Sequence, residues 1–561
     1  MQRDAFLTLT TRISFTLCVA SFGLLFWNAH LFPSLGTDSL IYHLTIPAFW
    51  AQQGFLSTID LPFHDSAAEH SPALAEWIYF FLLQWNRGDS LVWGVQPFFY
   101  LLMIRFFYLS ARLLNNHRNS ALLIAALFLY FPPFLTNAQY ANNDLVMTCG
   151  CAWFLYGILY SRIRPHAGTL HAITGLCLMV STKYVAIIYL LAGLPLLFCV
   201  SNRLHLSTCS RNSLVLAGLF LSIVISPPLF FYLKNTLLWN NPIYPAEIGI
   251  GTWSIGQFLY NPAALISHSW SAENLSRMLL HAPEMEFGMH GSVGCLLWLG
   301  WVGTLISWVL ARHKKSWISY YVTAVFPLLS IILFFWKTPF WSEHRLLFPV
   351  YYGLCLGVAL TIGNVSRKQT FIARSGVSWI LLLVILIVFI STFHVRMNRS
   401  FLAGQLINES PEAIRNARYA SSYPGLADAW NLIQEQTADN PGVIAYSGSA
   451  VIFPLFGNEL QNSVHYIPIS ENDFPQQIHL TRGDNLYEKL ATTRRKSFDK
   501  DYWIGQLKIQ RVTHLILVDD PKRGGVAAEH QMIRSAPEHF HLLYEQKNVR
   551  VYQVLATSFG S

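Results

Sequence analysis

Long apolar runs recur through the first two-thirds of this 561-residue chain. A helix needs roughly 20 mostly apolar residues to span a bilayer. Candidate spans of about this length are 13–32, 90–111, 120–136, 144–161, 213–232, 291–311, 317–336, 346–363 and 376–394. Only 12% of the residues are charged, against about 25% in a typical soluble domain. These features predict an α-helical polytopic membrane protein, with 13–32 as a retained first helix rather than a cleaved signal.

The stretch 170–200 decides the topology. It is long for one straight helix and has Lys183 in its middle, so we expect a hairpin of two short helices that meet near Lys183. Most Lys and Arg of the short loops then fall on one side, as the positive-inside rule requires. A single span would place ARHKKS (311–316) and SRKQTFIAR (366–374) outside. We therefore predict eleven membrane helices, with the N-terminus in the cytoplasm, in a bacterial inner membrane.

Two domains are predicted. Residues 1–394 form the transmembrane domain, with large outer loops at 34–88 and 233–290 that contain amphipathic segments. Polar residues return after 395, and strand-like runs at 442–449, 464–469, 513–520 and 549–555 alternate with helical patterns at 426–436 and 527–536. This alternation predicts an α/β domain over 395–561. On the predicted topology it lies on the periplasmic or extracellular side.

Ionisable groups gather on the predicted outer face, where their cost near the membrane indicates function. A carboxylate there can accept a proton from a hydroxyl, and a nearby cation can stabilise a departing phosphate. The candidate site residues are Asp38, Asp144, Lys183, Arg345, Lys234, His43, Glu343 and His344.

Structural alternatives stay open for several of these residues. Asp38 and Asp144 each stand where an N-cap would stand. Lys183 could be a snorkelling lysine, and Arg345 and Lys234 could be helix-end anchors. His43 could be a hydrogen-bonded helix residue.

A metal site is not predicted. His64, Asp65, Glu69 and His70 are close in sequence, but their spacing fits no HExxH pattern. A divalent metal therefore remains an alternative without support from spacing.

Five segments carry a resemblance to a known family: GTDSLIYHLTIP (36–47), YANNDLVMT (140–148), STKY (181–184), KNTLLWNNPIYP (234–245) and EHRLLFP (343–349). With these segments and its α/β tail, the chain resembles the GT-C superfamily of integral-membrane glycosyltransferases. The resemblance is nearest to the protein O-mannosyltransferase and lipid A aminoarabinose transferase group. It covers most of the chain by architecture, although each motif is degenerate.

The resemblance implies a polyprenyl-phosphate sugar as donor and an inverting transfer on the outer side of the membrane. It assigns the catalytic base to Asp38, and to Asp144 the second acid, which orients the acceptor or binds a metal. Lys183 and Arg345 would contact the lipid phosphate. Some relatives carry an Asp-Glu pair in the first loop, whereas Ser39 follows Asp38 here, which puts a paired-carboxylate mechanism in question.

The main alternative function is a transporter or flippase for a lipid-linked or anionic substrate. Transporters tend to carry internal repeats and midplane binding groups, whereas this sequence has no detectable repeat and its charges favour one interface. A membrane scaffold is a third alternative. No nucleic-acid partner is expected, because the net charge of +8 arises from Lys and Arg spread over short segments between apolar runs. The sequence leaves the sugar and the acceptor (lipid, glycan or protein) open.

Overall fold

The structure is a computed structural model of the chain. It describes residues 36–201, 211–256, 292–310, 317–337, 344–368, 410–473, 497–519 and 525–555, apart from short gaps within these ranges, and a few isolated positions before residue 36. The predicted spans 13–32 and 376–394 lie outside the described residues, as does most of the second outer loop.

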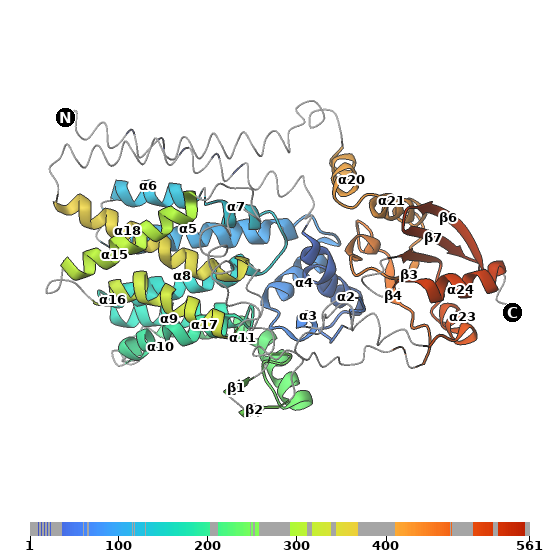
Figure 1. Ribbon diagram of the computed structural model, residues 1–561, viewed down its shortest axis with the longest axis horizontal. Coiled ribbons are helices and arrows are strands. Elements are labelled where there is room, and N and C mark those ends of the chain that lie inside the picture. Colours follow the sequence, from blue (N-terminus) through green and yellow to red (C-terminus); the bar gives the residue numbers. More distant parts are fainter. Residues whose placement is uncertain are drawn as a thin grey trace.

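The described helices from Val95 to Lys368 form a bundle of apolar helices (Figure 1). Its helices are α5 (Val95–Leu113), α6 (Arg118–Leu129), α7 (Pro132–Asn137), α8 (Asp144–Tyr160), α9 (Pro165–Val180), α10 (Ala186–Ser201), α11 (Arg211–Trp239), α15 (Ser292–Leu310), α16 (Trp317–Tyr320), α17 (Phe326–Lys337) and α18 (Phe348–Lys368). The π-helical turn η5 (Tyr321–Val325) joins α16 to α17. α5 packs on α6 and α8, and α15 packs on α18.

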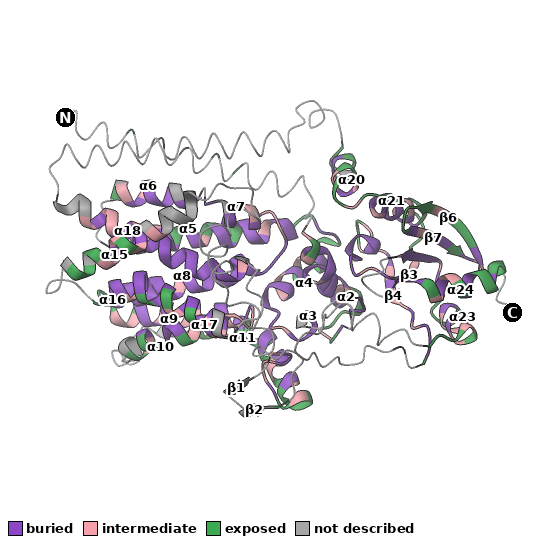
Figure 2. Cartoon of the chain, viewed as in Figure 1, coloured by how far each residue is buried: buried purple, intermediate pink, exposed green. Residues whose placement is uncertain are grey.

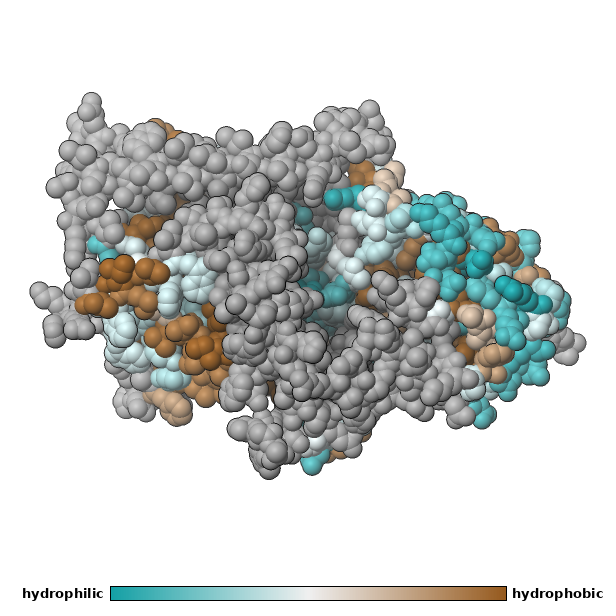
Figure 3. Space-filling model, viewed as in Figure 1, coloured by the Kyte–Doolittle hydropathy of each residue, from teal (hydrophilic) through white to brown (hydrophobic). Residues whose placement is uncertain are grey.

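Four described helical segments are long and apolar enough to cross a membrane: Val92–Leu113, Gly218–Trp239, Trp317–Phe334 and Arg345–Asn364. α8 and α10 contain shorter apolar helices. Brown apolar side chains also gather on the visible face of the bundle (Figure 3). The helical, apolar character predicted for this part of the chain is confirmed, while the number of eleven membrane helices stays a prediction.

The predicted span 120–136 is not one helix. α6 ends at Leu129, and α7 begins at Pro132 after Phe131, whose ψ of 110° is extended. A residue that precedes proline is pushed out of the helical region, and proline has no N–H for the helix ladder. The Pro132–Pro133 pair therefore breaks the run.

The hairpin predicted at 170–200 is confirmed. α9 ends at Val180 and α10 begins at Ala186, so Lys183 lies in the turn between them. The sequence pattern placed the start of the first helix too late, because α9 already begins at Pro165.

α8 and α9 approach each other unusually closely through glycines. A Cβ atom on Gly157 would lie 2.3 Å from the backbone nitrogen of Ala172, and one on Gly175 would lie 2.2 Å from that of Phe154. Only residues without a side chain allow such a backbone approach. The contact brings the start of α8 beside the turn that follows α9.

The described residues of the segment 36–94, which includes most of the first predicted outer loop, are folded into short helices that lie between the bundle and the C-terminal sheet (Figure 1). They are η1 (Ser39–His43), α2 (Thr45–Gln53), α3 (Ala67–His70), α4 (Leu74–Asn86) and η2 (Val92–Gly94). α2 packs on α4, and the buried Trp50 contacts Phe80 at a ring distance of 6.4 Å. The amphipathic character predicted for this loop thus corresponds to helices η1 and α2.

The C-terminal part is an α/β unit with a five-stranded sheet in the order β4-β3-β5-β7-β6. β3, β4 and β5 are parallel, and β7 runs antiparallel to both β5 and β6. Its elements are α20 (Pro411–Ser422), α21 (Leu426–Gln436), β3 (Val443–Ser447), η7 (Phe453–Phe456), β4 (Ser463–Tyr466), α23 (Lys500–Ile509), β5 (His514–Val518), α24 (Ala527–Ser535), η9 (Pro537–His539), β6 (Phe540–Gln546) and β7 (Val549–Val554). Its visible surface is largely hydrophilic (Figure 3).

Side chains of the segment 36–94 contact the C-terminal part. Arg415 forms an ion pair with Asp89, and Gln52 donates to the carbonyl of Asn462. The rings of Phe49 and Phe456 meet edge to face at 5.0 Å. Buried residues accordingly occur both inside the bundle and at the junction with the first loop (Figure 2). The C-terminal part therefore supports the loop that carries Asp38.

Candidate functional site

Asp38 stands at the start of η1 and does not act as a helix cap. Its backbone is helical (φ −61°, ψ −35°), and its side chain makes no cap hydrogen bond. Instead, its Oδ2 atom accepts a hydrogen bond of 2.8 Å from the Tyr42 hydroxyl and forms an ion pair with the Arg345 guanidinium. Capping alone therefore does not account for Asp38.

The electrostatic surroundings keep Asp38 ionised. Burial raises its pKa, but the charges of Arg345 and His43 and the Tyr42 hydrogen bond outweigh burial and hold the pKa well below its usual range. The carboxylate remains 25% exposed, so it lies at the rim of the cluster.

Asp144 is the innermost acid of the cluster, with a fully buried side chain. It is the first residue of α8, and Lys183 from the α9–α10 turn donates to its Oδ1 atom at 2.8 Å. The Nε atom of Arg345 lies 4.0 Å from its Oδ2 atom. Arg345, in the short helix η6 (His344–Leu347), thus stands between the two acids.

These four side chains come from points far apart in the sequence. Asp38 and Arg345 are separated by 307 positions, and Asp144 and Lys183 by 39. The close packing of α8 and α9 brings Asp144 and Lys183 together, and the turn before α18 brings Arg345 to both acids. We call this set of residues, Asp38, Asp144, Lys183 and Arg345, the acid–cation cluster.

Beside the cluster lies a buried pair of His43 and Glu76. The Nδ1 atom of His43 is 2.5 Å from the Oε1 atom of Glu76, and the Asn143 amide donates to the same oxygen at 3.2 Å. Glu76 was not predicted from the sequence. The sequence did contain a feature that points to Glu76, because Glu76 is the one acid in the apolar helix LAEWIYFFLLQWN.

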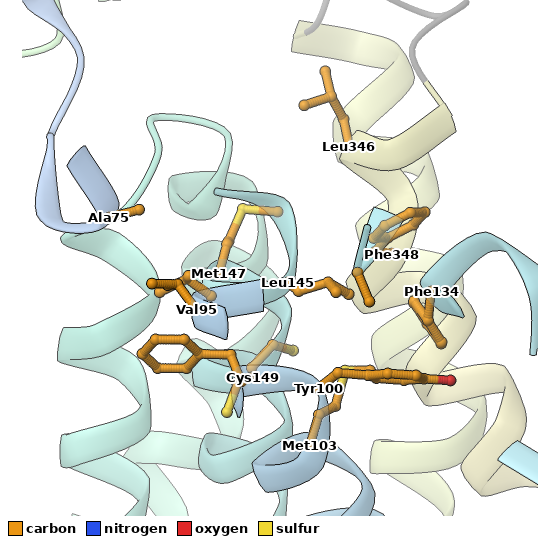
Figure 4. Close-up of a cluster of buried hydrophobic side chains, with 14 of the residues drawn as sticks. Ala75, Val95, Tyr100, Met103, Phe134, Leu145, Met147, Cys149, Leu346 and Phe348 are labelled. Carbon is orange, nitrogen blue, oxygen red and sulfur yellow. The ribbon is translucent and has the colours of Figure 1, made fainter. Parts of the chain in front are cut away.

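We call the buried hydrophobic side chains that adjoin the polar residues the apolar floor, and Figure 4 labels several of them. Ala75, Leu145 and Leu346 directly adjoin Glu76, Asp144 and Arg345 in the sequence, and they belong to the same hydrophobic cluster as Met147 and Phe348. Charge interactions in such dry surroundings are stronger than they are in water. The floor therefore strengthens the attraction between the acids and the cations.

The C-terminal part reaches the rim of the cluster. The hydroxyls of Thr37 and Tyr423 lie 3.4 Å apart, and Asp38 acts electrostatically on Tyr423. Tyr423 directly follows α20, so α20 places an aromatic hydroxyl beside Thr37, the residue before Asp38.

Lys234 has a different set of partners. Its Nζ atom donates to Thr58 Oγ1 and to the Glu69 carbonyl, each at 3.3 Å, and lies 5.0 Å from the centre of the Phe231 ring. Burial, aided by the Lys234 charge, lowers the pKa of the neighbouring His70 to about 3. The role predicted for Lys234 in substrate binding stays a prediction.

Glu343 lies outside the described residues, and so does the side chain of His344. The same is true of His64 and Asp65. Among the residues that the structure describes, no group of three or more His, Cys, Asp or Glu side chains could hold a metal ion. The Lys183 ammonium pairs with the Oδ1 atom of Asp144.

Comparison with known proteins gives matches in structure. No family model matches the chain, and no curated protein matches its sequence. ArnT from Cupriavidus metallidurans bound to undecaprenyl phosphate matches with a TM-score of 0.54 at 12% identity, over 99% of this chain and 98% of that one. The same protein in the apo state gives a TM-score of 0.50 at 14% identity, over 99% of both chains.

A further match is the oligosaccharyltransferase from Archaeoglobus fulgidus in the apo form, with a TM-score of 0.48 at 12% identity. It covers 92% of this chain and 69% of the other. At these identities a match establishes the fold alone. The resemblance made from the sequence is confirmed at that level: the chain has, over nearly its whole length, the fold of ArnT, a GT-C glycosyltransferase.

Proposed function

We propose that this chain is a membrane glycosyltransferase that moves a sugar from a polyprenyl-phosphate donor to an acceptor on the outer side of the membrane. The observation that carries the proposal is the acid–cation cluster, in which two carboxylates share Arg345 and one of them also binds Lys183. The shared fold with ArnT, which has been crystallised with undecaprenyl phosphate, supports the donor class.

The proposed donor site is the cationic side of the cluster. The side chains of Arg345 and Lys183 are 17% and 18% exposed, so both can meet a phosphate without a large rearrangement. Guanidinium and ammonium groups form strong charge-assisted hydrogen bonds to phosphate oxygens. Asp144 interacts with both cations. Because its side chain is fully buried, we assign it the role of positioning them rather than of reacting with the substrate.

Asp38 is the proposed general base. In the structure, the Arg345 guanidinium holds Asp38 as a stable, weakly basic carboxylate. A donor phosphate that binds Arg345 competes with Asp38 for that cation. The basicity of Asp38 then rises when the donor is in place, so the donor itself activates the base.

The reaction is a single displacement with inversion at the anomeric carbon. The acceptor hydroxyl loses its proton to Asp38, and its oxygen forms the new bond to the sugar. The bond between the sugar and the phosphate oxygen breaks, and its electron pair leaves with the polyprenyl phosphate. Arg345 and Lys183 stabilise the negative charge that this phosphate gains.

The remaining parts of the proposal concern organisation. Residues 1–394 form the catalytic membrane domain, and 395–561 form an outer domain whose Tyr423 hydroxyl lies 3.4 Å from that of Thr37, next to Asp38. The protein lies in a bacterial inner membrane with a cytoplasmic N-terminus. His43, Lys234, Glu343 and His344 remain proposed substrate-binding residues.

Transfer assays on matched variants test the proposal. Purified protein in lipid nanodiscs receives a panel of undecaprenyl-phosphate hexoses and pentoses, with bacterial membrane extract as the source of acceptors. Asp38→Asn should lower transfer at least roughly 100-fold while the protein stays folded. Asp89→Asn is the control, because Asp89 is an arginine-paired acid of the same loop region outside the cluster.

Full transfer by Asp38→Asn would refute the base assignment. Movement of the lipid-linked sugar across sealed vesicles without chemical change would overturn the transferase in favour of a transporter.

A further inference from the structure

We infer that Tyr42 is a positioning residue for the transfer reaction. Its hydroxyl holds one carboxylate oxygen of Asp38, so that the other oxygen, Oδ1, takes the proton of the acceptor hydroxyl. The inference rests on the proposed function, in which Asp38 is the base. It gives a role to Tyr42, which was not predicted as a site residue from the sequence.

Both groups that bind the Asp38 carboxylate bind the same oxygen atom. The Tyr42 hydroxyl donates to Oδ2 at 2.8 Å, and the Arg345 guanidinium pairs with Oδ2 as well. Within the part of the chain that the structure describes, the hydrogen bonds and ion pairs of this carboxylate all end at Oδ2. Oδ1 is not one of the polar atoms buried without a partner, and the side chain is 25% exposed. An acceptor hydroxyl can therefore reach Oδ1.

The Asp38 carboxylate needs a second hold besides Arg345. The last torsion angle of an aspartate side chain has a broad, roughly two-fold preference, so the carboxylate plane turns easily unless something fixes it. In the proposed reaction the donor phosphate competes with Asp38 for Arg345. The hydrogen bond from Tyr42 does not depend on that cation, so it keeps Oδ1 in place while the acceptor approaches.

The Tyr42 ring is itself held in position. It packs against buried hydrophobic side chains of the bundle and against those of the α2–α4 pair, which include Ile46 and Trp50. Burial and the nearby Asp38 carboxylate raise the pKa of Tyr42 well above its usual value. The hydroxyl therefore keeps its hydrogen and remains a donor to Asp38.

The backbone turn that carries Asp38 and Tyr42 is fixed as well. In η1 the Leu44 N–H donates to the Ser39 carbonyl at 3.0 Å, which closes a π-helical turn, and such turns are frequent at functional sites. The buried Ser39 hydroxyl donates to the side chain of Asn142 at 2.9 Å, two residues before α8. Asp38 and Tyr42, four residues apart, thus share one face of an anchored turn.

The change Tyr42→Phe keeps the ring and removes only the hydroxyl. In the nanodisc assay with undecaprenyl-phosphate sugar and acceptor extract, the transfer rate at saturating donor should fall roughly 10- to 100-fold, because the base is no longer held in place. The KM for the donor should stay unchanged, since the hydroxyl binds the base whereas the phosphate binds the cations. Tyr321→Phe is the matched control. It removes a tyrosine hydroxyl that donates to the Ala192 carbonyl at 3.1 Å inside the bundle, and it should keep the normal rate and KM.

A double variant separates positioning from a structural role. If the Tyr42 hydroxyl acts only through Asp38, Asp38→Asn/Tyr42→Phe should transfer as slowly as Asp38→Asn alone, to within about 2-fold. A hydroxyl that supports the fold or binds a substrate would instead lower the residual transfer by a further factor of roughly 10 or more.

An unchanged or faster transfer rate in Tyr42→Phe would overturn the inference. A donor KM that rises together with the loss of rate would also overturn it, and so would a further loss in the double variant. Failure of the unchanged protein to transfer any sugar, or full transfer by Asp38→Asn, would instead defeat the proposed function, and both are read from separate reactions.

Discussion

Removal of Lys183 is the most informative test of the buried end of the acid–cation cluster. At 2.8 Å and an effective dielectric constant of ~20, the attraction between Lys183 and Asp144 is about 6 kcal/mol before desolvation is counted. Breaking a buried pair from one side leaves an uncompensated charge and typically costs about 3–5 kcal/mol. Arg345 at 4.0 Å still compensates part of that charge, so we expect Lys183→Met to cost roughly 3 kcal/mol, at the low end.

The double variant Lys183→Met/Asp144→Asn provides the matched comparison. It removes both charges together, so it should cost less than Lys183→Met alone, with a coupling energy of about 2 kcal/mol between the two positions. The free energies come from unfolding titrations of the purified protein in mixed detergent micelles, followed by tryptophan fluorescence. Strict additivity of the two single effects would refute the idea that the pair is coupled inside a dry site.

The remaining predictions concern packing, pH and the junction with the C-terminal part. Gly157→Ala should destabilise the protein by at least ~3 kcal/mol, because its new methyl would lie 2.3 Å from the Ala172 backbone nitrogen. The matched change Gly218→Ala meets nothing within 4 Å and should be neutral or slightly stabilising. Unfolding of both variants in detergent measures the difference. His70 is held neutral by burial, with a pKa of about 3 against 6.5 in the unfolded chain. The unfolded state therefore binds the extra proton, stability falls as the pH drops from 6.5 toward 3, and His70→Gln should flatten this loss in unfolding curves taken across that range. Arg415→Ala should leave Asp89 without its ion pair and raise protease cleavage of the C-terminal part, measured by limited proteolysis; unchanged cleavage would show that the contact is dispensable.

Much of the helical part could be predicted from the sequence, because a lipid bilayer requires long apolar helices and an uneven distribution of Lys and Arg between the two sides. Apolar runs mark α5, α8, α15 and α18, and the positive-inside rule identifies the α9–α10 hairpin. The break at Pro132 was also readable, since paired prolines seldom continue a helix.

Four of the five C-terminal strands were predicted. β3, β5 and β7 fall within three of the predicted runs, and β4 overlaps the run 464–469. β6 was missed because it is an edge strand with largely exposed residues, so its sequence FHLLYEQ lacks a clean alternation of apolar and polar residues.

The candidate site, too, could be predicted only in part from the sequence. The cost of charges near a membrane identifies Asp38, Asp144, Lys183 and Arg345 as unusual, but no local pattern tells which of them meet. Their convergence depends on the glycine contact between α8 and α9 and on the turn before α18, which are tertiary features. Glu76 was missed because one acid in an apolar helix reads as an isolated exception until its partner is seen.

The most direct test of the central claim is the binding of undecaprenyl phosphate, without sugar, to protein in nanodiscs. Arg345→Gln and Lys183→Gln each remove one cation, and a charge-assisted hydrogen bond contributes about 1.5–3 kcal/mol, so each variant should bind roughly 10- to 100-fold more weakly. Arg415→Gln, which removes an arginine outside the cluster, should bind as the unchanged protein does. Equal affinity in all four proteins would contradict the assignment of the acid–cation cluster as the phosphate site.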